Sequence, residues 1–252
     1  MTYLSIEQIH KNKTGKVSDK WQSYLSFYDR LLNEYRTKKL NLMEIGVQNG
    51  GSLETWKTFF PNANVFIGCD IDERCGNLQY DDPRVNIVVG DANLPDTINK
   101  ISTICSEFDI IIDDGSHQST DILRSFLIYF PMVKPEGIFV IEDVHTLYQS
   151  QYGGGILNEF SAYNFFKKII DVVSFQFWKD DLSMDVFFRT FFPAGQIPAF
   201  IKEGWIESIE FKNSLIVIRK SIAPTHDKLG ARYITGDSAE VNDSVLKYRQ
   251  NI

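Results

Sequence analysis

The chain has 252 residues, of which 43% are hydrophobic, enough for one large α/β domain or two small ones. Its formal net charge of −7 and its lack of any Lys/Arg block argue against nucleic-acid binding. The first twenty residues show no apolar signal core, and no apolar stretch reaches the ~20 residues that cross a bilayer. We therefore expect a soluble, cytoplasmic protein that binds no membrane and keeps its three cysteines reduced.

The first predicted element is an amphipathic helix over residues 20–35, where aromatic residues recur at helical spacing. A short apolar strand over residues 41–45 then leads into a glycine-rich turn. The next predicted helix has Ser52 as its N-cap and ends at Pro61. The chain thus enters a strand–turn–helix unit.

Strands and helices continue to alternate after this unit, which predicts a doubly wound, mostly parallel sheet of the Rossmann-like α/β class. The last two strands are separated by Lys212 and Asn213, a connection short enough for a hairpin, so one edge strand should run antiparallel. The remaining predicted strands cover residues 65–69, 85–89, 109–112, 138–141, 206–211 and 214–218.

Residues 144–203 are less regular, with three glycines at 153–155 and a helical pattern over 158–173. Seven of the nineteen phenylalanines lie between Ser174 and Phe200, and that many rings must be covered. They could line an acceptor pocket, form a subunit interface, or pack into the core. The polar tail from Ser221 should pack loosely.

Two neighbouring predicted strands each end in a pair of acids, Asp113 with Asp114 and Glu142 with Asp143. Because parallel strands place their carboxyl ends on one edge of the sheet, these four acids should crowd one crevice. They would repel one another unless a cation lies among them or protons are retained. His117 follows closely, which suggests a divalent metal with a base beside it. The alternatives are that the acids cap helices and turns and that His117 is structural.

The glycine-rich turn and Asp70, twenty residues after Gly50, suit a dinucleotide or S-adenosylmethionine equally well. The turn lacks the G-x-G-x-x-G pattern that cradles a pyrophosphate. Glu44 and Asp91 would moreover repel a pyrophosphate but attract the sulfonium and ammonium groups of S-adenosylmethionine. Electrostatics therefore favours the methyl donor.

These motifs together resemble the class I S-adenosylmethionine-dependent methyltransferases. More narrowly, the chain resembles the metal-dependent sugar O-methyltransferases of macrolide biosynthesis, the mycinamicin and macrocin group, which overlaps a cephalosporin hydroxylase-like set. The resemblance covers roughly residues 17–236. It is carried by Met43-Glu44-Ile45-Gly46 with Gly50-Gly51-Ser52-Leu53-x-x-Trp56, by Asp113-Asp114-Gly115-Ser116-His117, and by Ile141-Glu142-Asp143.

The resemblance implies a catalytic site in which His117 is the base and acts beside Asp114. Mg²⁺ or Mn²⁺ would be held by Asp114, Glu142 and Asp143. We expect the donor site to be lined by Glu44, Gly46, Asn49, Gly50, Ser52, Asp70, Asp91 and Asp113.

The predicted function is O-methylation of a sugar hydroxyl, in a nucleotide-linked sugar or a glycoside, for capsule, lipopolysaccharide or antibiotic biosynthesis. A phenol is the alternative acceptor. The alternative hypotheses from other functional classes are a nicotinamide oxidoreductase and a non-catalytic donor-binding subunit. We expect a homo-oligomer.

We expect a single methyltransferase domain over residues 1–252. Its predicted parts are an N-terminal helical cover (1–39), a donor-binding core (40–143), an aromatic-rich insert or acceptor lid (144–203), a C-terminal hairpin (204–220) and a tail (221–252).

Overall fold

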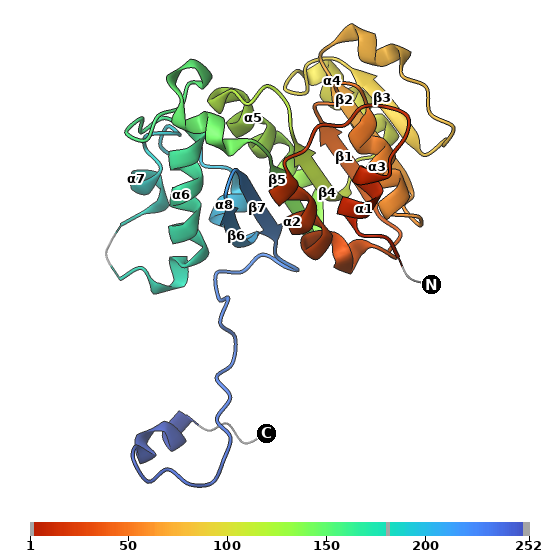
Figure 1. The fold of residues 1–252 in the computed structure, drawn as a ribbon. Coiled ribbons are helices and arrows are strands. Elements are labelled where there is room, and N and C mark those ends of the chain that lie inside the picture. The colour runs from red at the N-terminus through yellow and green to blue at the C-terminus, as the bar shows by residue number, and fades with distance from the viewer. Residues whose placement is uncertain (1–2, 180–181, 249–252) are drawn as a thin grey trace.

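The computed structural model describes residues 3–179 and 182–248, and within them one seven-stranded sheet forms the centre of the fold (Figure 1). The strand order is β3-β2-β1-β4-β5-β7-β6. The strands are β1 (Asn41–Ile45), β2 (Val65–Asp70), β3 (Val85–Val89), β4 (Phe108–Asp113), β5 (Val133–Ile141), β6 (Ile206–Lys212) and β7 (Leu215–Lys220).

The first five strands run parallel, as predicted, because helices cross over between them. From β1 the chain moves outward to β2 and β3, and then returns to place β4 on the other side of β1. The order therefore reverses between β1 and β4, where open α/β sheets bind their ligands.

The C-terminal hairpin differs from the prediction in one respect. The antiparallel strand is β7, which is inserted between β5 and β6 and is not the edge strand. Leu215–Lys220 is almost wholly buried, whereas β6 alternates between half-buried and exposed residues after a buried Ile206. The more apolar strand therefore takes the interior position, and the amphipathic one forms the edge.

Strand β5 begins earlier than predicted, because residues 135–137 do not end it in a turn. Phe108 pairs with Val133 and Ile110 pairs with Ile138, so the intervening residues form a bulge in β5. Glu136 in this bulge has a left-handed backbone, with φ 64°. The turn-forming residues thus bend the strand without ending it.

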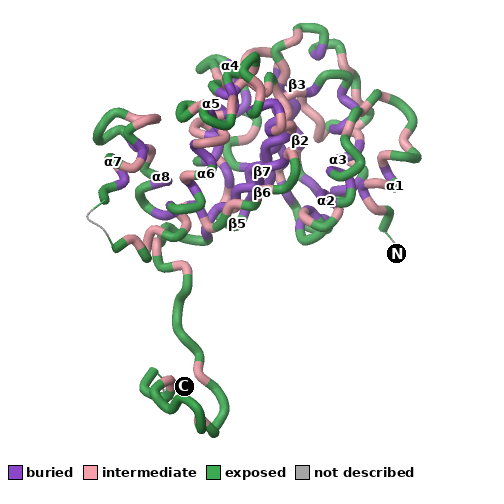
Figure 2. The backbone as a smooth tube through the Cα atoms, turned by 60° about the vertical axis from the view of Figure 1, so that its left-hand side comes forward, coloured by how far each residue is buried: buried purple, intermediate pink, exposed green. Residues whose placement is uncertain are grey.

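Helices cover both faces of the sheet. One face packs against α1, α2 and α3, and the other packs against α4, α5, α6 and α8. Figure 2 shows the buried sheet between exposed outer helix faces. The α-helices are α1 (Ile6–Lys11), α2 (Gln22–Leu32), α3 (Gly51–Phe59), α4 (Pro95–Ile104), α5 (Ser119–Tyr129), α6 (Ala162–Val173), α7 (Met184–Phe187) and α8 (Ala199–Lys202). Short 3-10 helices are η1 (Asn33–Tyr35), η2 (Glu73–Asn77), η3 (Phe130–Met132), η4 (Val144–Tyr148), η5 (Ser150–Tyr152), η6 (Phe175–Phe177) and η7 (Asp243–Tyr248). None of the helices in the described part of the chain has the length and apolar character needed to cross a bilayer.

Ser52 does not cap α3, contrary to the prediction. The N-cap is Gly50, with φ 79°, and Ser52 lies inside the first turn, where its hydroxyl donates a hydrogen bond to Glu44 at 2.6 Å. Its partner is a buried carboxylate, which competes with the backbone amides for the serine side chain.

The aromatic-rich segment packs mainly into the core. Phe188 and Phe200 are buried and contact rings from α5 and α6, including Phe126 and Phe165. Of the three interpretations, core packing therefore applies to these rings, although Phe177 remains exposed.

The tail is held near its start, where the Lys228 ammonium group donates to the Gly204 carbonyl oxygen at 2.8 Å. Figure 1 shows it then leading away from the domain. Residues 1–2 of the predicted cover, 180–181 of the predicted lid and 249–252 of the predicted tail lie outside the described residues.

Candidate active site

An acidic cavity of about 470 Å³ opens at the carboxyl edge of the sheet, beside β1 and β4. Among the described residues, Lys20 is the only lysine or arginine that lines it, whereas the aspartates in its wall number eight. Such a wall focuses a negative potential and favours a cationic ligand. The eight are Asp19, Asp70, Asp72, Asp91, Asp113, Asp114, Asp121 and Asp143.

The glycines of the turn after β1 make room for the protein's own atoms. A Cβ on Gly46 would overlap the backbone carbonyl of Asp114, and one on Gly51 would overlap the carbonyl of Val17. Gly46 also has φ 89°, which side chains rarely adopt. The close approach that Gly46 and Gly51 permit is therefore between segments of the chain itself.

The predicted donor-site residues divide into two groups. Gly46, Ser52, Asp70, Asp91 and Asp113 line the cavity. Glu44, Asn49 and Gly50 are not among its lining residues.

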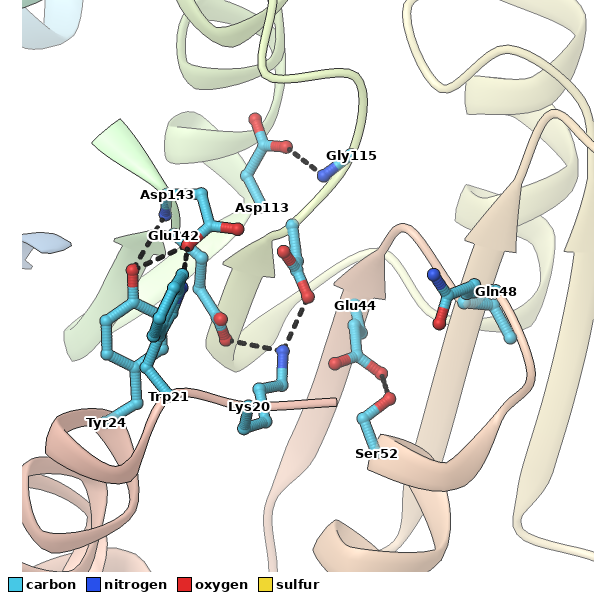
Figure 3. Close-up of polar contacts among 12 residues, drawn as sticks. Lys20, Trp21, Tyr24, Glu44, Gln48, Ser52, Asp113, Gly115, Glu142 and Asp143 are labelled. Atoms are coloured by element: carbon cyan, nitrogen blue, oxygen red, sulfur yellow. Dashed lines mark hydrogen bonds and ion pairs between the residues drawn. The ribbon is translucent and has the colours of Figure 1, made fainter. Parts of the chain in front are cut away.

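The position of Glu44 follows from the pleat of β1. Leu42 belongs to the core beneath α2 and α3, and Glu44, two residues later, points to the same side. There it accepts hydrogen bonds from Ser52 and, at 3.2 Å, from the indole of Trp56. Burial raises the pKa of Glu44 to about 7, against the opposing charge of Lys20. Figure 3 shows Glu44 directed at Ser52.

Asp70 is held in place by three backbone amides. Its carboxylate accepts hydrogen bonds from Val47 at 2.7 Å and from Gln48 and Asp72 at 2.8 Å. A carboxylate offers about four acceptor sites, so about one remains for a ligand hydroxyl.

Asp113 is buried between β4 and α5. It accepts hydrogen bonds from the Ser125 hydroxyl and, at 3.3 Å, from the Gly115 amide. Burial raises the pKa of Asp113 to about 7, although both hydrogen bonds act in the opposite direction. Asp113 thus lies behind the loop that carries Asp114 and His117.

Lys20 joins the N-terminal segment to two of the predicted metal ligands. Its ammonium group lies 2.5 Å from Asp114 Oδ2 and 2.9 Å from Glu142 Oε1, with only 6% of its side chain exposed. Figure 3 shows Lys20 directed at Glu142. Burial by itself would lower the pKa of Lys20, but the charges of Glu142 and Asp114 raise it above its ordinary value. Lys20 thus places a positive charge between two of the four crowded acids.

By family resemblance, the sequence placed residues 18–20 near the donor, but it gave Lys20 no role at the predicted metal ligands. Its partners lie 94 and 122 residues further along the chain. The available signal was weak: a lysine immediately before an amphipathic helix, in a chain with two acidic pairs elsewhere.

Glu142 is enclosed by its partners. The Tyr28 hydroxyl donates to Glu142 Oε1 at 2.8 Å, the same oxygen that Lys20 contacts. Burial raises the pKa of Glu142 to about 8, with Lys20 acting against it. Glu142 does not line the cavity.

Asp143, by contrast, is reached from the cavity. The Trp21 indole and the Tyr24 hydroxyl donate to its Oδ1 at 3.1 and 2.7 Å, while its Oδ2 lies 3.8 Å from His117 Nε2. Ligand atoms of Asp114, His117 and Asp143 all lie within 4.8 Å of one another. This spacing allows one cation to touch all three side chains.

The backbone around this cluster is strained. His117 and Asp143 have φ 57° and 54°, and Gln48 across the cavity has φ 50°. Left-handed backbone is costly for residues other than glycine and gathers at functional sites. The loops after β1, β4 and β5 therefore hold these three residues in unusual positions at one cavity.

No protein-family model matches the chain. The chain is similar to a demethylmacrocin O-methyltransferase of Streptomyces fradiae, with 36% identity over 148 residues, covering 55% of this chain and 36% of that protein. It is also similar to a mycinamicin VI 2''-O-methyltransferase of Micromonospora griseorubida, with 38% identity over 134 residues, covering 50% of this chain and 33% of that protein. The match thus spans about a third of the length of these relatives.

Among solved structures, the chain is similar to the MycE methyltransferase of the mycinamycin biosynthetic pathway, crystallised with Mg and SAH. The TM-score is 0.70 at 26% identity, and the match covers 90% of this chain and 56% of that chain. The sheet and its flanking helices are therefore common to both proteins.

Proposed function

We propose that this chain, which has the class I methyltransferase fold, is the catalytic domain of an S-adenosylmethionine-dependent O-methyltransferase. It transfers a methyl group to a sugar hydroxyl with the help of a divalent cation, Mg²⁺ or Mn²⁺. The observation that carries the proposal is the cluster of Asp114, His117 and Asp143 at an acidic cavity beside the switch point of the sheet. The names of the similar proteins support the reaction and the class of acceptor.

The cavity fits the methyl donor by charge. S-adenosylmethionine carries a sulfonium and an ammonium group, and eight aspartates face it here. Asp70 retains about one acceptor site for a ribose hydroxyl, and Asp91 and Asp113 add negative charge nearby. A pyrophosphate would be repelled by the same wall, which counts against a nicotinamide cofactor.

The cation site fits a hard metal ion, because carboxylate oxygens are the ligands that Mg²⁺ and Mn²⁺ prefer. Asp114 and Asp143 are two of its proposed ligands. The third is Glu142 by family resemblance, or His117 by the spacing of the ligand atoms. When bound, the cation would lower the pKa of the acceptor hydroxyl and orient it.

His117 is the proposed base, a role that it can take when Glu142 is the third metal ligand and the imidazole is free. A neutral imidazole nitrogen can accept a proton, which suits the role of a general base. His117 accepts the hydroxyl proton as the oxygen–methyl bond forms and the sulfur–methyl bond breaks, which leaves a methyl ether and S-adenosylhomocysteine. Asp143, 3.8 Å away, stabilises the imidazolium that results.

The first experiment combines donor binding with an acceptor screen. S-adenosylhomocysteine binding is measured by calorimetry, and methyl glycosides and nucleotide-linked sugars are incubated with S-adenosylmethionine and Mg²⁺. We expect one methyl mass gain, lost in excess EDTA and restored by Mg²⁺. Full activity in EDTA would refute the metal, and failure to bind S-adenosylhomocysteine would refute the function.

The second experiment tests the base. The change His117→Asn should lower kcat by about 10²- to 10⁴-fold while S-adenosylhomocysteine binding is kept. His226→Asn is the matched control, because His226 contacts the Lys202 carbonyl oxygen, away from the cavity. Comparable losses in the two variants would contradict the assignment.

The third metal ligand is decided by Mg²⁺ affinity. If Glu142 is a ligand, Glu142→Gln weakens Mg²⁺ binding by at least about tenfold and His117→Asn does not. If His117 is the ligand, the order reverses. Calorimetric titration with Mg²⁺ in the presence of S-adenosylhomocysteine distinguishes the two.

The same proposal includes the role of residues 144–203, the oligomeric state and the location of the protein in the cell. Residues 144–203 would cover the acceptor, and the protein would act as a cytoplasmic homo-oligomer on a small-molecule sugar. Three free thiols, at Cys69, Cys75 and Cys105, are consistent with a reducing compartment. Light scattering coupled to gel filtration tests the oligomer.

A further inference from the structure

Trp21 departs from the usual residue preference at the start of α2. It occupies the N-cap position, where Ser, Thr, Asp or Asn is preferred, and its side chain makes no capping hydrogen bond. It is also 61% exposed, although tryptophan is usually buried. Departures of this kind from local preference are expected at functional positions.

The exposed ring is nevertheless fixed in orientation. Its Nε1 donates to Asp143 Oδ1 at 3.1 Å, and it meets the ring of His145 nearly edge-on, with centroids 6.2 Å apart at 88°. His145 is itself held by the Ser214 hydroxyl at 2.5 Å. Figure 3 shows Trp21 beside Tyr24, both directed toward Asp143. A rigid aromatic surface is thereby presented at little cost in conformational entropy.

The Trp21 ring lies outside the donor cavity and is joined to its wall by the hydrogen bond to Asp143. Asp143 and His117 line the cavity, and Trp21 does not. The same carboxylate that accepts the indole N–H through Oδ1 faces His117 through Oδ2. Because Trp21 and His117 face the two oxygens of one carboxylate, an acceptor whose hydroxyl reaches His117 lies near Trp21.

We propose that Trp21 is the platform on which the acceptor sugar ring stacks, a specificity-determining role that rests on the proposed function. The axial C–H bonds of a pyranose are weakly positive and are attracted to the negative face of an indole. Its hydroxyls meanwhile point toward the carboxylate and imidazole side. Stacking on Trp21 selects a ring with an apolar C–H face and directs one hydroxyl at His117.

The test uses two substitutions that separate stacking from contact with Asp143. Trp21→Phe keeps an aromatic face but loses the N–H, whereas Trp21→Ser loses the ring and supplies a favourable N-cap. Tyr233→Leu is the matched control, because Tyr233 is 78% exposed and lies in the tail, outside the residues that line the cavity.

The direct readout is saturation-transfer NMR with aromatic protons irradiated. The probes are methyl α-D-glucopyranoside, methyl α-L-rhamnopyranoside and methyl β-D-galactopyranoside, with S-adenosylhomocysteine and Mg²⁺ present. We expect saturation of the ring C–H protons of at least one glycoside, retained in Trp21→Phe and Tyr233→Leu and lost in Trp21→Ser. No saturation in the wild type, or its persistence in Trp21→Ser, overturns the proposal.

Kinetics supply the second readout, with the acceptor that is methylated fastest. Trp21→Ser should raise the acceptor KM roughly tenfold, in line with one lost stacking contact, and change kcat little. Equal effects of Trp21→Phe and Trp21→Ser, with altered Mg²⁺ dependence, would show that Trp21 only positions Asp143 and would refute stacking. S-adenosylhomocysteine binding is measured in parallel, so failure of the methyltransferase function itself is recognised separately.

Discussion

Replacing Lys20 with methionine tests whether this ammonium group holds the acids of the site together. The substitution keeps most of the side-chain volume and removes the charge between Asp114 and Glu142. The Glu142 carboxylate, with 2% of its side chain exposed, then keeps Tyr28 as its hydrogen-bond donor but has lost its cation. An uncompensated buried charge is among the costliest defects in a protein.

The magnitude depends on pH because Glu142 can take up a proton. Breaking a buried ion pair by removing one partner costs about 3–5 kcal/mol of unfolding free energy. With Lys20 present, the pKa of Glu142 is about 8, and without it the native-state pKa rises further. A carboxyl whose native pKa exceeds its unfolded value loses stability as pH rises between the two values. The variant should therefore lose the full amount at pH 9 and less at pH 6.

The assay is urea unfolding followed by circular dichroism at both pH values. Lys57→Met is the matched control, because Lys57 also makes a 2.5 Å ion pair, but its partner Asp81 has 88% of its side chain exposed. That change should cost under about 1 kcal/mol at either pH. The double variant Lys20→Met with Glu142→Gln should recover most of the loss. A Lys20→Met protein within about 1 kcal/mol of the wild type at pH 9, or one that the second change does not rescue, would refute the reasoning.

Three further predictions concern neighbouring residues. Glu44→Gln should flatten the pH dependence of stability. The native pKa of Glu44 is about 7, so the wild type loses up to about 3 kcal/mol of unfolding free energy between pH 4.5 and 7. Identical pH slopes of the unfolding free energy in urea would count against this. Gly46→Ala should lower the melting temperature clearly more than Gly195→Ala does. Both glycines have φ near 80°, but a Cβ on Gly46 meets backbone atoms and one on Gly195 meets nothing within 4 Å. Equal losses would show that φ alone matters. Asp143→Asn should abolish the rise in melting temperature that Mg²⁺ gives the wild type, and an unchanged rise would exclude Asp143 as a ligand.

Local patterns predicted much of the fold. The bounds of β1 and β3 agree with the predicted strands, because apolar runs and turn residues are short-range signals. The bulge in β5 and the late start of α6 at Ala162 were not foreseen. In α6 the Ser161 side chain caps the helix, so the helix begins at Ala162 although the helical pattern begins at residue 158.

The meeting of Asp114, His117 and Asp143 was also within reach of the sequence. Their strands are parallel neighbours, and Asp113 pairs with Ile141 in the register. Residues that follow the ends of paired parallel strands must share an edge. That rule needs only the strand assignments and the order of the elements.

Other features depended on the tertiary structure. The sequence specified four acids that would repel one another unless a cation lay among them or protons were retained, but the docking of the N-terminal segment decided that Lys20 lies between Asp114 and Glu142. Only the packed fold turned Glu44 toward α3, put β7 inside the sheet and left Trp21 exposed beside Asp143. Hydrophobic periodicity and turn-forming residues act over a few residues, so their effects can be predicted directly from the sequence. Contacts across a hundred residues depend on which surfaces pack together, and that is settled only when the whole chain has folded.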